Sequence, residues 1–549
     1  MIPIRYTVEQ FEELTSRQYW GNPVDYVEEN ANKYPHKTAL IDSGSRLTFL
    51  EAKQRSDRLA IRLLEMGLKR DDRIVVQLPN VVEWIIVHTA LKKAGLIGLY
   101  TMLYLRHKEI EHASEQMEAV GHIIMGSFRG FDYFTMTSEI APKLPHLKHI
   151  FVVGDDVPED AVSINGMMNE PLEKEYPADY LDSKKVRWGE IYQLRVTSGT
   201  TGMPKLVECA LTHSSLENTI KDRYKVSHKD VFAALAPLAG GPSGVHCRGF
   251  GIAQREGCTV AMLEKFDAEE AVKLIERERV TFATGVPTML AMISSLPNLA
   301  DYDLSSLRVF EVAGAVLPYS AAKEFEEKVG SKVINRLGGV DIGFGATSCI
   351  DDPPQVRWGS VGKPIPDITL KLLDEDGNEV PQGEVGEIAY AKKRGSDRSY
   401  YRDLEMTLAR ESQGLARTGD LGKFDEEGNL YVVGRRKDVI IRGGQNIFPA
   451  EIESMLITHP SVADVAIVGM PDKVMGEKAC AYVICKPGCT LTFNEATSFL
   501  LDKKVAKYKL PERLQLVTSF PTSGDGQKVM KRKLTEDVTA RLKAERAID

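Results

Sequence analysis

The sequence is poor in cysteine, and the cysteines it has are not grouped. Seven occur among 549 residues, and none lies in a Cys-x-x-Cys pair. They are Cys209, Cys247, Cys258, Cys349, Cys480, Cys485 and Cys489. An odd number without such pairs argues against a disulfide scaffold and favours a reduced, cytoplasmic chain. Cys485 and Cys489 resemble half of a metal site, but no second half follows them, so we expect no metal there.

Long apolar runs are also missing. No stretch of about 18 apolar residues occurs, so the sequence predicts no membrane-spanning helix. The first residues, Met1 to Tyr6, lack the long apolar region of a secretory signal. The formal net charge of -8 argues against broad nucleic-acid binding, although a local basic tail lies between Lys528 and Arg546. We therefore expect a soluble chain without a nucleic-acid partner, acting as a monomer or homodimer.

The chain is long enough for several folded units. Domains of about 100–200 residues would divide 549 residues into roughly three or four units. Apolar residues after position 47 recur at helical spacing, 73–78 reads as a buried strand, and 83–94 reads as a helix. Strand and helix signals keep alternating through residues 140–340. This alternation predicts α/β layers with largely parallel strands.

The pattern changes after about residue 360. Glycines there separate short β-like runs, which predicts a small barrel-like or twisted sheet. The charged segment Gly434–Asp438 is followed by an independent α+β pattern, with a helix at 449–457 and strands at 465–468 and 479–485. We predict a large N-terminal domain, residues 1–436, of layered α/β subdomains plus a small β-barrel-like subdomain. Residues 437–549 would form a small, mobile α+β domain.

The most informative segment is Thr197-Ser198-Gly199-Thr200-Thr201-Gly202-Met203-Pro204-Lys205, which follows a strand expected at 189–196. Glycines let a backbone approach a ligand closely, hydroxyl and N–H groups bind phosphate oxygens, and Lys205 adds positive charge. No G-x-x-x-x-G-K-[ST] motif occurs, so the segment is not a Walker A loop. Taken alone, it is either a polyphosphate clamp or a polar surface turn.

Small and acidic residues follow two other predicted strands. Ala313-Gly314-Ala315 comes after a strand at 308–312, and its small side chains leave room for a flat base. Gly338-Gly339-Val340-Asp341 is expected as a loop after a strand at 333–337. Because ligands gather where parallel strands end, both segments can line one cleft. Asp341 either binds Mg²⁺, which prefers oxygen ligands, or is a solvated acid.

Two further segments carry candidate chemistry. Arg417-Thr418-Gly419-Asp420 is predicted as a tight turn, where Asp420 either accepts hydrogen bonds from ribose hydroxyls or caps the turn itself. Lys528 lies in a glycine-containing loop after a strand expected at 514–517. Such a lysine can move into a cleft as an electrophilic group, and the alternative is an ordinary surface lysine.

In this order, the segments resemble the adenylate-forming superfamily of acyl-CoA synthetases, peptide-synthetase adenylation domains and luciferases. The resemblance extends from about residue 25 to 540, and 197–205, 285–288, 417–420 and 434–444 support it. Asp351-Asp352-Pro353-Pro354 is most similar to the stand-alone aryl-acid branch. The resemblance implies that a carboxylate attacks the α-phosphorus of ATP to give an acyl-adenylate and pyrophosphate. A thiol, here that of coenzyme A, then attacks the acyl carbon and releases AMP.

The resemblance also implies roles for individual residues. The nucleotide and its phosphates are bound by Thr197, Ser198, Gly199, Thr200, Thr201, Gly202, Lys205, Ala313, Gly314, Ala315, Gly338, Asp420 and Arg435. The implied catalytic residues are Lys528, Thr197 and Asp341, with Asp341 and Thr200 as Mg²⁺ ligands. Lys437 falls at the interdomain hinge, and Gly443 and Gly444 line the thiol tunnel. The acyl pocket is formed by Gly240, Gly241, His246, Gly285, Val286 and Gly339.

Four features depart from the family pattern. Leu337 stands where the family has an aromatic residue, Asp341 replaces a glutamate, and Gln527 is an extra residue before Lys528. Gly240 and Gly241 stand where the aryl-acid branch has a His-Asn pair. These glycines, with few charges nearby, predict an apolar acyl group that is aromatic, alicyclic or short and unsaturated. His246 either contacts this group or is a packed structural histidine.

Three functions fit the motifs. We favour an AMP-forming acyl-CoA ligase, whose net reaction is reversible when AMP and pyrophosphate are abundant. A stand-alone adenylating enzyme that loads a carrier-protein thiol shares every motif. A relative that binds nucleotide without turnover is favoured by Leu337, Asp341 and Gln527, but the retained phosphate segment, Asp420, Lys437 and Lys528 oppose it.

Overall fold

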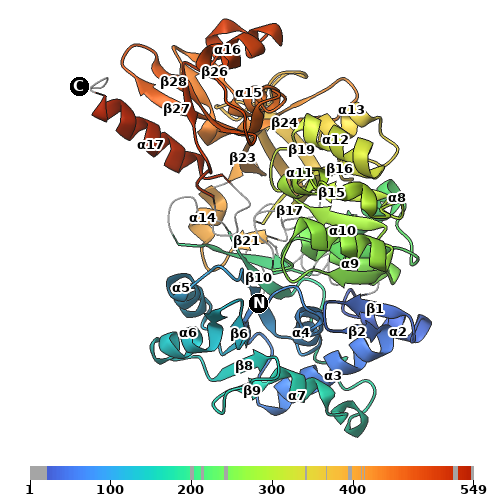
Figure 1. Cartoon of the computed structure of the whole chain (residues 1–549). Helices are drawn as coiled ribbons and strands as arrows, with labels where there is room; N and C mark the ends of the chain where they lie inside the picture. Colours follow the sequence, from blue (N-terminus) through green and yellow to red (C-terminus); the bar gives the residue numbers. More distant parts are fainter. Residues whose placement is uncertain are drawn as a thin grey trace.

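The computed structural model describes residues 22–197, 203–211, 216–239, 245–340, 343–366, 368–392, 398–409, 411–412, 414–522 and 529–545. It has two large, mainly parallel sheets, a smaller antiparallel sheet and a C-terminal α+β unit. Figure 1 shows the first sheet at the bottom in blue and teal, the second beside it in green, and the C-terminal unit at the top in orange and red. The predicted fold class is confirmed.

The first sheet has eight strands, and its central members run parallel. In spatial order they are β21 (Arg398–Tyr400), β11 (Leu206–Ala210), β10 (Ile191–Val196), β4 (Ile97–Tyr100), β3 (Arg73–Gln77), β5 (Gly121–Met125), β8 (His149–Val153) and β9 (Val162–Ser163). The helices along this part of the chain are α3 (Phe49–Glu65), α4 (Val82–Lys93), α5 (His107–Met117), α6 (Tyr133–Ile140) and α7 (Ile164–Asn169). The antiparallel strands β11 and β21 close one edge.

Local sequence explains where these helices begin and end. Thr48 precedes α3, and its hydroxyl accepts the Glu51 N–H at 3.2 Å while the Glu51 carboxylate accepts the Thr48 N–H at 2.7 Å. This capping box satisfies backbone donors that the first helical turn leaves open. Leu59 and Leu63 of α3 are fully buried, as their spacing predicts. Gly95 follows α4 with a φ of 72°, a left-handed conformation that ends the helix.

The second sheet has nine strands, parallel through its middle. They are β18 (Lys363–Pro364), β17 (Gly343–Thr347), β16 (Lys332–Gly339), β15 (Val309–Val312), β14 (Phe282–Gly285), β12 (Val231–Ala234), β13 (Thr259–Met262), β1 (Thr38–Ile41) and β2 (Arg46–Thr48). Helices along this part are α2 (Tyr26–Lys33), α8 (Leu216–Tyr224), α9 (Val245–Glu256), α10 (Ala268–Glu278), α11 (Pro287–Ser294), α12 (Tyr319–Val329) and α13 (Pro354–Gly359).

The loop expected at residues 338–341 is partly wrong. Strand β16 continues through Gly338 and Gly339, which pair with Phe344 and Gly343 of the antiparallel β17. A Cβ atom at Gly338 would lie 2.9 Å from the Gly343 carbonyl oxygen. Only glycine permits this close strand pairing, so the glycines extend the strand instead of ending it.

The third sheet is antiparallel and contains the segment that carries Asp420. Its strands are β19 (Ile368–Leu373), β20 (Gly386–Lys392), β23 (Leu415–Phe424) and β22 (Glu411–Ser412), with β24 (Leu430–Arg435) paired to β23 and α14 (Leu404–Ala409) nearby in sequence. The tight turn expected at 417–420 is wrong, because these residues lie inside β23. On the β20 side, Arg417 pairs with Ala389 and Leu421 with Glu387, so residues 418–420 form a bulge within the strand in place of the expected turn.

The C-terminal unit has its own apolar core. Its strands are β25 (Ile440–Arg442), β26 (Gln445–Ile447), β27 (Val462–Asp472), β28 (Gly476–Cys485) and β29 (Arg513–Leu516), with helices α15 (Pro449–Leu456), α16 (Phe493–Asp502) and α17 (Lys531–Ala544). Its two clusters of buried side chains draw only on residues from Ile440 onward. The short helix η4 (Arg436–Asp438) lies directly before this unit. None of the described helices is long and apolar enough to cross a membrane.

The cysteine environments predict which thiols react. The free thiols of Cys258 and Cys480 are buried, and burial raises the pKa of each to about 12, whereas Cys489 is exposed. Because the thiolate is the reactive form, iodoacetamide at pH 8 should modify Cys489 in the folded protein and leave the two buried thiols unmodified. Peptide mass spectrometry with and without about 8 M urea, which unfolds the chain, checks this. Native modification of Cys258 or Cys480 at the rate of Cys489 would contradict these environments.

Candidate active site

Two antiparallel strands hold the ends of the phosphate segment together. Strand β10 enters it and β11 leaves it, with Val196 opposite Leu206. The Thr197 N–H donates to the Lys205 carbonyl at 2.9 Å, which closes the base of the loop. The Lys205 ammonium lies 5.6 Å from the Tyr400 ring centroid. Ser198, Gly199, Thr200, Thr201 and Gly202 lie outside the described residues.

A buried arginine joins β11, the strand that leaves this loop, to the second sheet. Arg398 on β21 stands opposite Cys209 on β11, and its guanidinium donates to the Cys209 sulfur. The same Nη1 donates to the Val340 carbonyl at 3.2 Å. Arg398 thus holds the end of the β16 segment against the strand that leaves the phosphate loop. Asp341, the next residue, lies outside the described residues.

The candidate adenine and acyl residues meet at one edge of the second sheet. Gly285 pairs with Val312, so β14 and β15 end side by side, and Val312 pairs with Asn335 of β16, which continues past them to Gly339. Val286 and Ala313 follow these strand ends and are buried, while Gly314, with a φ of 89°, and Ala315 are exposed. The carboxyl ends of parallel strands are where ligands bind in such sheets.

A buried ion pair lies in the strands behind this edge. The Glu311 carboxylate lies 3.1 Å from Arg336 Nη1 as an ion pair and accepts the Tyr224 hydroxyl at 3.0 Å, and Tyr224 also bonds Thr347. Burial raises the pKa of the Glu311 carboxyl, and the Arg336 guanidinium opposes that rise. Glu311 lies on β15, one residue before Val312, and Arg336 lies on β16, one residue before Leu337. The ion pair therefore holds β15 and β16 together close to the candidate adenine segment.

The candidate ribose aspartate is paired across two strands. Asp420 on β23 stands opposite Arg435 on β24, and Arg435 Nε lies 3.0 Å from the Asp420 carboxylate. Burial lowers the pKa of Lys437 in η4, Arg435 lowers it further, and Asp438 and Asp420 raise it in part. Asp420, Arg435 and Lys437 therefore form one electrostatic group.

The two candidate tunnel glycines lie in the turn between β25 and β26. Gly443 has a φ of 55° and Gly444 a φ of 81°. The Gly443 N–H donates to the Met475 carbonyl at 2.8 Å, and a Cβ there would lie 2.5 Å from the Met475 methyl carbon. Both positions therefore favour glycine, and the turn leaves an exposed backbone surface.

Asn80 is a site residue that the sequence analysis missed. Its buried side chain follows β3, donates to the Ala236 carbonyl at 2.9 Å and accepts the Leu238 N–H at 2.7 Å. It fixes the chain just before Gly240 and Gly241, which lie outside the described residues. The same limit applies to Lys528 and to the side chain of His246, which lies in the first turn of α9. The sequence offered one signal for Asn80: it is a polar residue that follows shortly after the buried strand β3.

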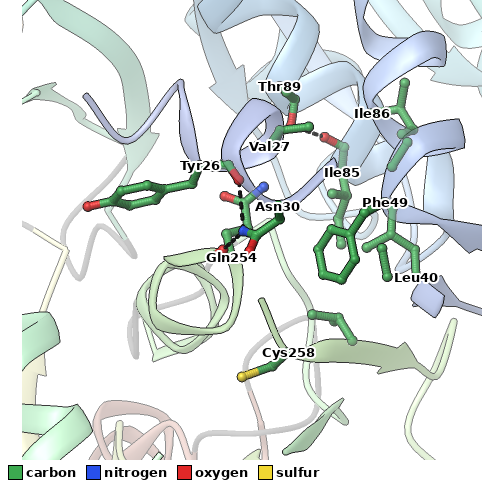
Figure 2. A pocket seen from close by; sticks show the side chains of 13 residues that line it. Tyr26, Val27, Asn30, Leu40, Phe49, Ile85, Ile86, Thr89, Gln254 and Cys258 are labelled. Carbon is green, nitrogen blue, oxygen red and sulfur yellow. Dashed lines mark hydrogen bonds between the residues drawn. The ribbon is translucent and has the colours of Figure 1, made fainter. Parts of the chain in front are cut away.

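A small cavity lies away from all of these residues. It has a volume of about 30 Å³ and lies between α2, α3, α4 and the end of α9, with Asn30, Phe49, Ile85 and Cys258 in its wall (Figure 2). Ligand pockets for drug-sized molecules are typically about 300–1,000 Å³. The cavity is too small for an acyl substrate, so it is a packing gap and not the candidate active site.

The comparisons with known proteins identify the family to which the chain is similar. The AMP-binding enzyme family matches residues 27–401, and the AMP-binding enzyme C-terminal domain matches residues 451–527. The chain is 31% identical over 527 residues to 2,3-dihydroxybenzoate-AMP ligase of Bacillus subtilis (strain 168), covering 95% of this chain and 94% of that one. It is 32% identical over 516 residues to 2-hydroxy-7-methoxy-5-methyl-1-naphthoate--CoA ligase of Streptomyces carzinostaticus, covering 91% and 90%. The solved anthranilate CoA ligase AuaEII with anthranoyl-AMP has a TM-score of 0.86 and 25% identity, covering 97% and 99%.

The bonds of Asn80 predict a combined effect on stability and substrate binding. Asn80→Ala leaves the Leu238 N–H and the Ala236 carbonyl without their side-chain partner, and each unpaired buried group costs about 1–3 kcal/mol. We expect a lower melting temperature. We also expect a KM for the carboxylic acid that is at least about fivefold higher, because the backbone that leads into the acyl pocket is displaced. Calorimetry and pyrophosphate exchange measure the two effects. Asn494→Ala, at an exposed position of α16, is the control, and an Asn80 variant that behaves like it would disprove the role.

Proposed function

Because the chain belongs to the AMP-binding enzyme family of adenylate-forming ligases, we propose that it joins a carboxylic acid to the thiol of coenzyme A. In the first step, a carboxylate oxygen bonds to the α-phosphorus of ATP and the bond to pyrophosphate breaks. In the second, the thiol sulfur bonds to the acyl carbon, its proton is released, and AMP leaves. The observation that carries this assignment is the Arg398 bridge, which joins β11, the strand that leaves the phosphate loop, to the end of the β16 segment.

The described residues support specific roles in nucleotide binding. Thr197 and Lys205 hold the ends of the phosphate segment, and Ala313, Gly314 and Ala315 border the base. Asp420 accepts the ribose hydroxyls, since Arg435 keeps its carboxylate oriented. Gly285 and Val286 at the end of β14, and Gly339 on the extension of β16, would contribute to the acyl pocket. Each group would be held before reaction, which is how an active site lowers the entropic part of a barrier.

Magnesium suits the donor types that the motifs supply. The carboxylate of Asp341 and the hydroxyl of Thr200 are hard oxygen donors of the kind that Mg²⁺ prefers. The ion would supply charge stabilisation for the phosphate oxygens. Arg398 holds Val340, the residue before Asp341, against the strand that leaves the phosphate loop, and Asp341 and Thr200 themselves lie outside the described residues.

The proposed second step requires a mobile C-terminal unit. We place the boundary between residues 436 and 437, with Lys437 as the hinge, because the C-terminal core starts at Ile440. Rotation about that point would bring Gly443 and Gly444 to the acyl-adenylate and remove Lys528 from it. Their side-chain-free backbone leaves space for a pantetheine-like thiol arm. Coenzyme A is favoured over a carrier protein by the relatives that are CoA ligases.

An acid screen tests the substrate class. The purified chain should exchange radiolabelled pyrophosphate into ATP with benzoate-like, alicyclic or short unsaturated acids, because the pocket-edge residues Gly285, Val286 and Gly339 carry no charge. Dicarboxylates should give at least about tenfold less exchange, because their second carboxylate would be buried in the pocket without a charged partner. Product analysis then compares free coenzyme A with carrier proteins. Exchange with no acid at all would refute ligase activity, and thioester formed only on a carrier protein would refute the choice of coenzyme A.

Lys528→Ala tests the division between the two steps. Without the ammonium beside the attacking carboxylate, adenylate formation should slow about 100- to 1,000-fold, the usual effect of losing one electrostatic donor. Thioester formation from preformed acyl-adenylate should stay within about twofold, since a rotated domain no longer presents this lysine. Single-turnover assays measure both rates. Lys533→Ala, an exposed lysine on α17, is the matched control. Equal loss of both steps in the Lys528 variant would contradict this role.

A further inference from the structure

The segment that carries Asp420 rests on a buried carboxylate of the neighbouring strand. Glu387 lies on β20, and its side chain is only 7% exposed. One of its oxygens accepts Arg417 Nη1 at 2.7 Å, and the other accepts the Gly419 N–H at 3.1 Å. Glu387 therefore holds the side chain that begins the 417–420 segment and the backbone directly before Asp420.

The same carboxylate also binds the residue next to the hinge. Arg436 Nη1 lies 3.1 Å from the Glu387 oxygen that accepts Arg417. Arg436 is the first residue of η4, and Lys437 follows it. The preceding residue, Arg435, bonds Asp420. Two consecutive arginines thus connect the chain before the hinge to the ribose segment, one directly and one through Glu387.

The burial of the three groups separates their roles. A buried carboxylate requires a charged partner, and Arg417, 18% exposed, supplies it together with the Gly419 N–H. Arg436 is 51% exposed, and its other terminal nitrogen lies 3.8 Å from Glu375, which is 91% exposed. Arg436 is therefore not needed to neutralise Glu387. The contact of Arg436 with Glu387 connects the hinge to a carboxylate whose charge Arg417 already balances.

We propose that Glu387 is a positioning residue that fixes the ribose-binding segment and, through Arg436, the N-terminal side of the hinge. With that side held, rotation is confined to Lys437 and residues beyond it, so Gly443 and Gly444 return to one defined position. The inference rests on the function proposed above. It assigns Arg417 to nucleotide binding and Arg436 to domain movement, although both contact one carboxylate.

Two variants separate these assignments. Glu387→Gln keeps the shape of the side chain but removes its charge, and it should raise the KM for ATP at least tenfold in pyrophosphate exchange. Arg436→Gln should leave that KM within twofold and slow thioester formation at least fivefold, because the hinge loses its fixed side. Arg436→Lys should restore most of the thioester rate. Arg532→Gln, which removes an exposed ion pair with Glu536 on α17, is the control and should change neither quantity.

Hydrogen exchange of the ligand-free full-length chain tests the positioning itself. The Gly419 amide should exchange at least tenfold faster in Glu387→Gln and at the wild-type rate in Arg436→Gln. Unchanged Gly419 exchange in the Glu387 variant, or an Arg436 variant that raises the KM for ATP and spares thioester formation, would overturn the proposal. If Glu387→Gln does not fold, the half-exposed Arg436 variants still decide the hinge role. If the wild-type chain catalyses no pyrophosphate exchange with any acid, the proposed function is refuted. The exchange rate of the Gly419 amide still decides whether Glu387 positions the segment.

Discussion

The guanidinium of Arg398 connects the two large sheets at the point where the candidate site forms. It is buried, and it donates both to Cys209 on the first sheet and to the Val340 carbonyl at the end of the β16 segment. Both contacts use the same Nη1 atom, so one donor position joins a strand of each sheet. The two sheets also share an apolar core that includes Ile74 and Phe282, and Asn80 adds hydrogen bonds to the backbone of Ala236 and Leu238. To this general packing Arg398 adds a specific link between β11 and the end of the β16 segment.

Sequence patterns predicted the regular parts of the fold well. The buried strand β3, helix α4 and the parallel alternation follow from periodicity, which is a local property. The patterns failed at Gly338 and Asp420, where glycine-containing segments were expected to leave their strands. In both places the segment lies in a strand through pairing with a neighbouring strand: Gly338 pairs with Phe344 of β17, and Asp420 pairs with Arg435 of β24. Pairing partners of this kind are decided by the tertiary fold and not by local residue type.

The site residues that sequence reasoning missed share a different cause. Asn80, Glu387 and Arg398 act through partners far along the chain, such as Ala236, which is 156 positions from Asn80. None lies in a recognisable motif, and each looks like an ordinary polar residue beside or within a strand. What makes them important is burial combined with a specific partner, and neither is visible before the chain is folded. The motif residues, by contrast, can be recognised from their local sequence. They lie in or beside segments that Asn80, Glu387 and Arg398 hold in place.

The departures from the family pattern change how the nucleotide and acyl group would be held. Leu337 is buried with Ile388 and Leu430 and so contributes to packing between the second and third sheets. Adenine recognition would then depend more on the backbone near Ala313 and on the ribose contact at Asp420. Gly285, one of the candidate acyl-pocket residues, is closely surrounded, because a Cβ there would lie 3.0 Å from the Phe310 ring and 3.1 Å from the Met289 sulfur. The lack of a side chain at Gly285 therefore makes room for its own buried neighbours, and the position does not by itself indicate space for a substrate.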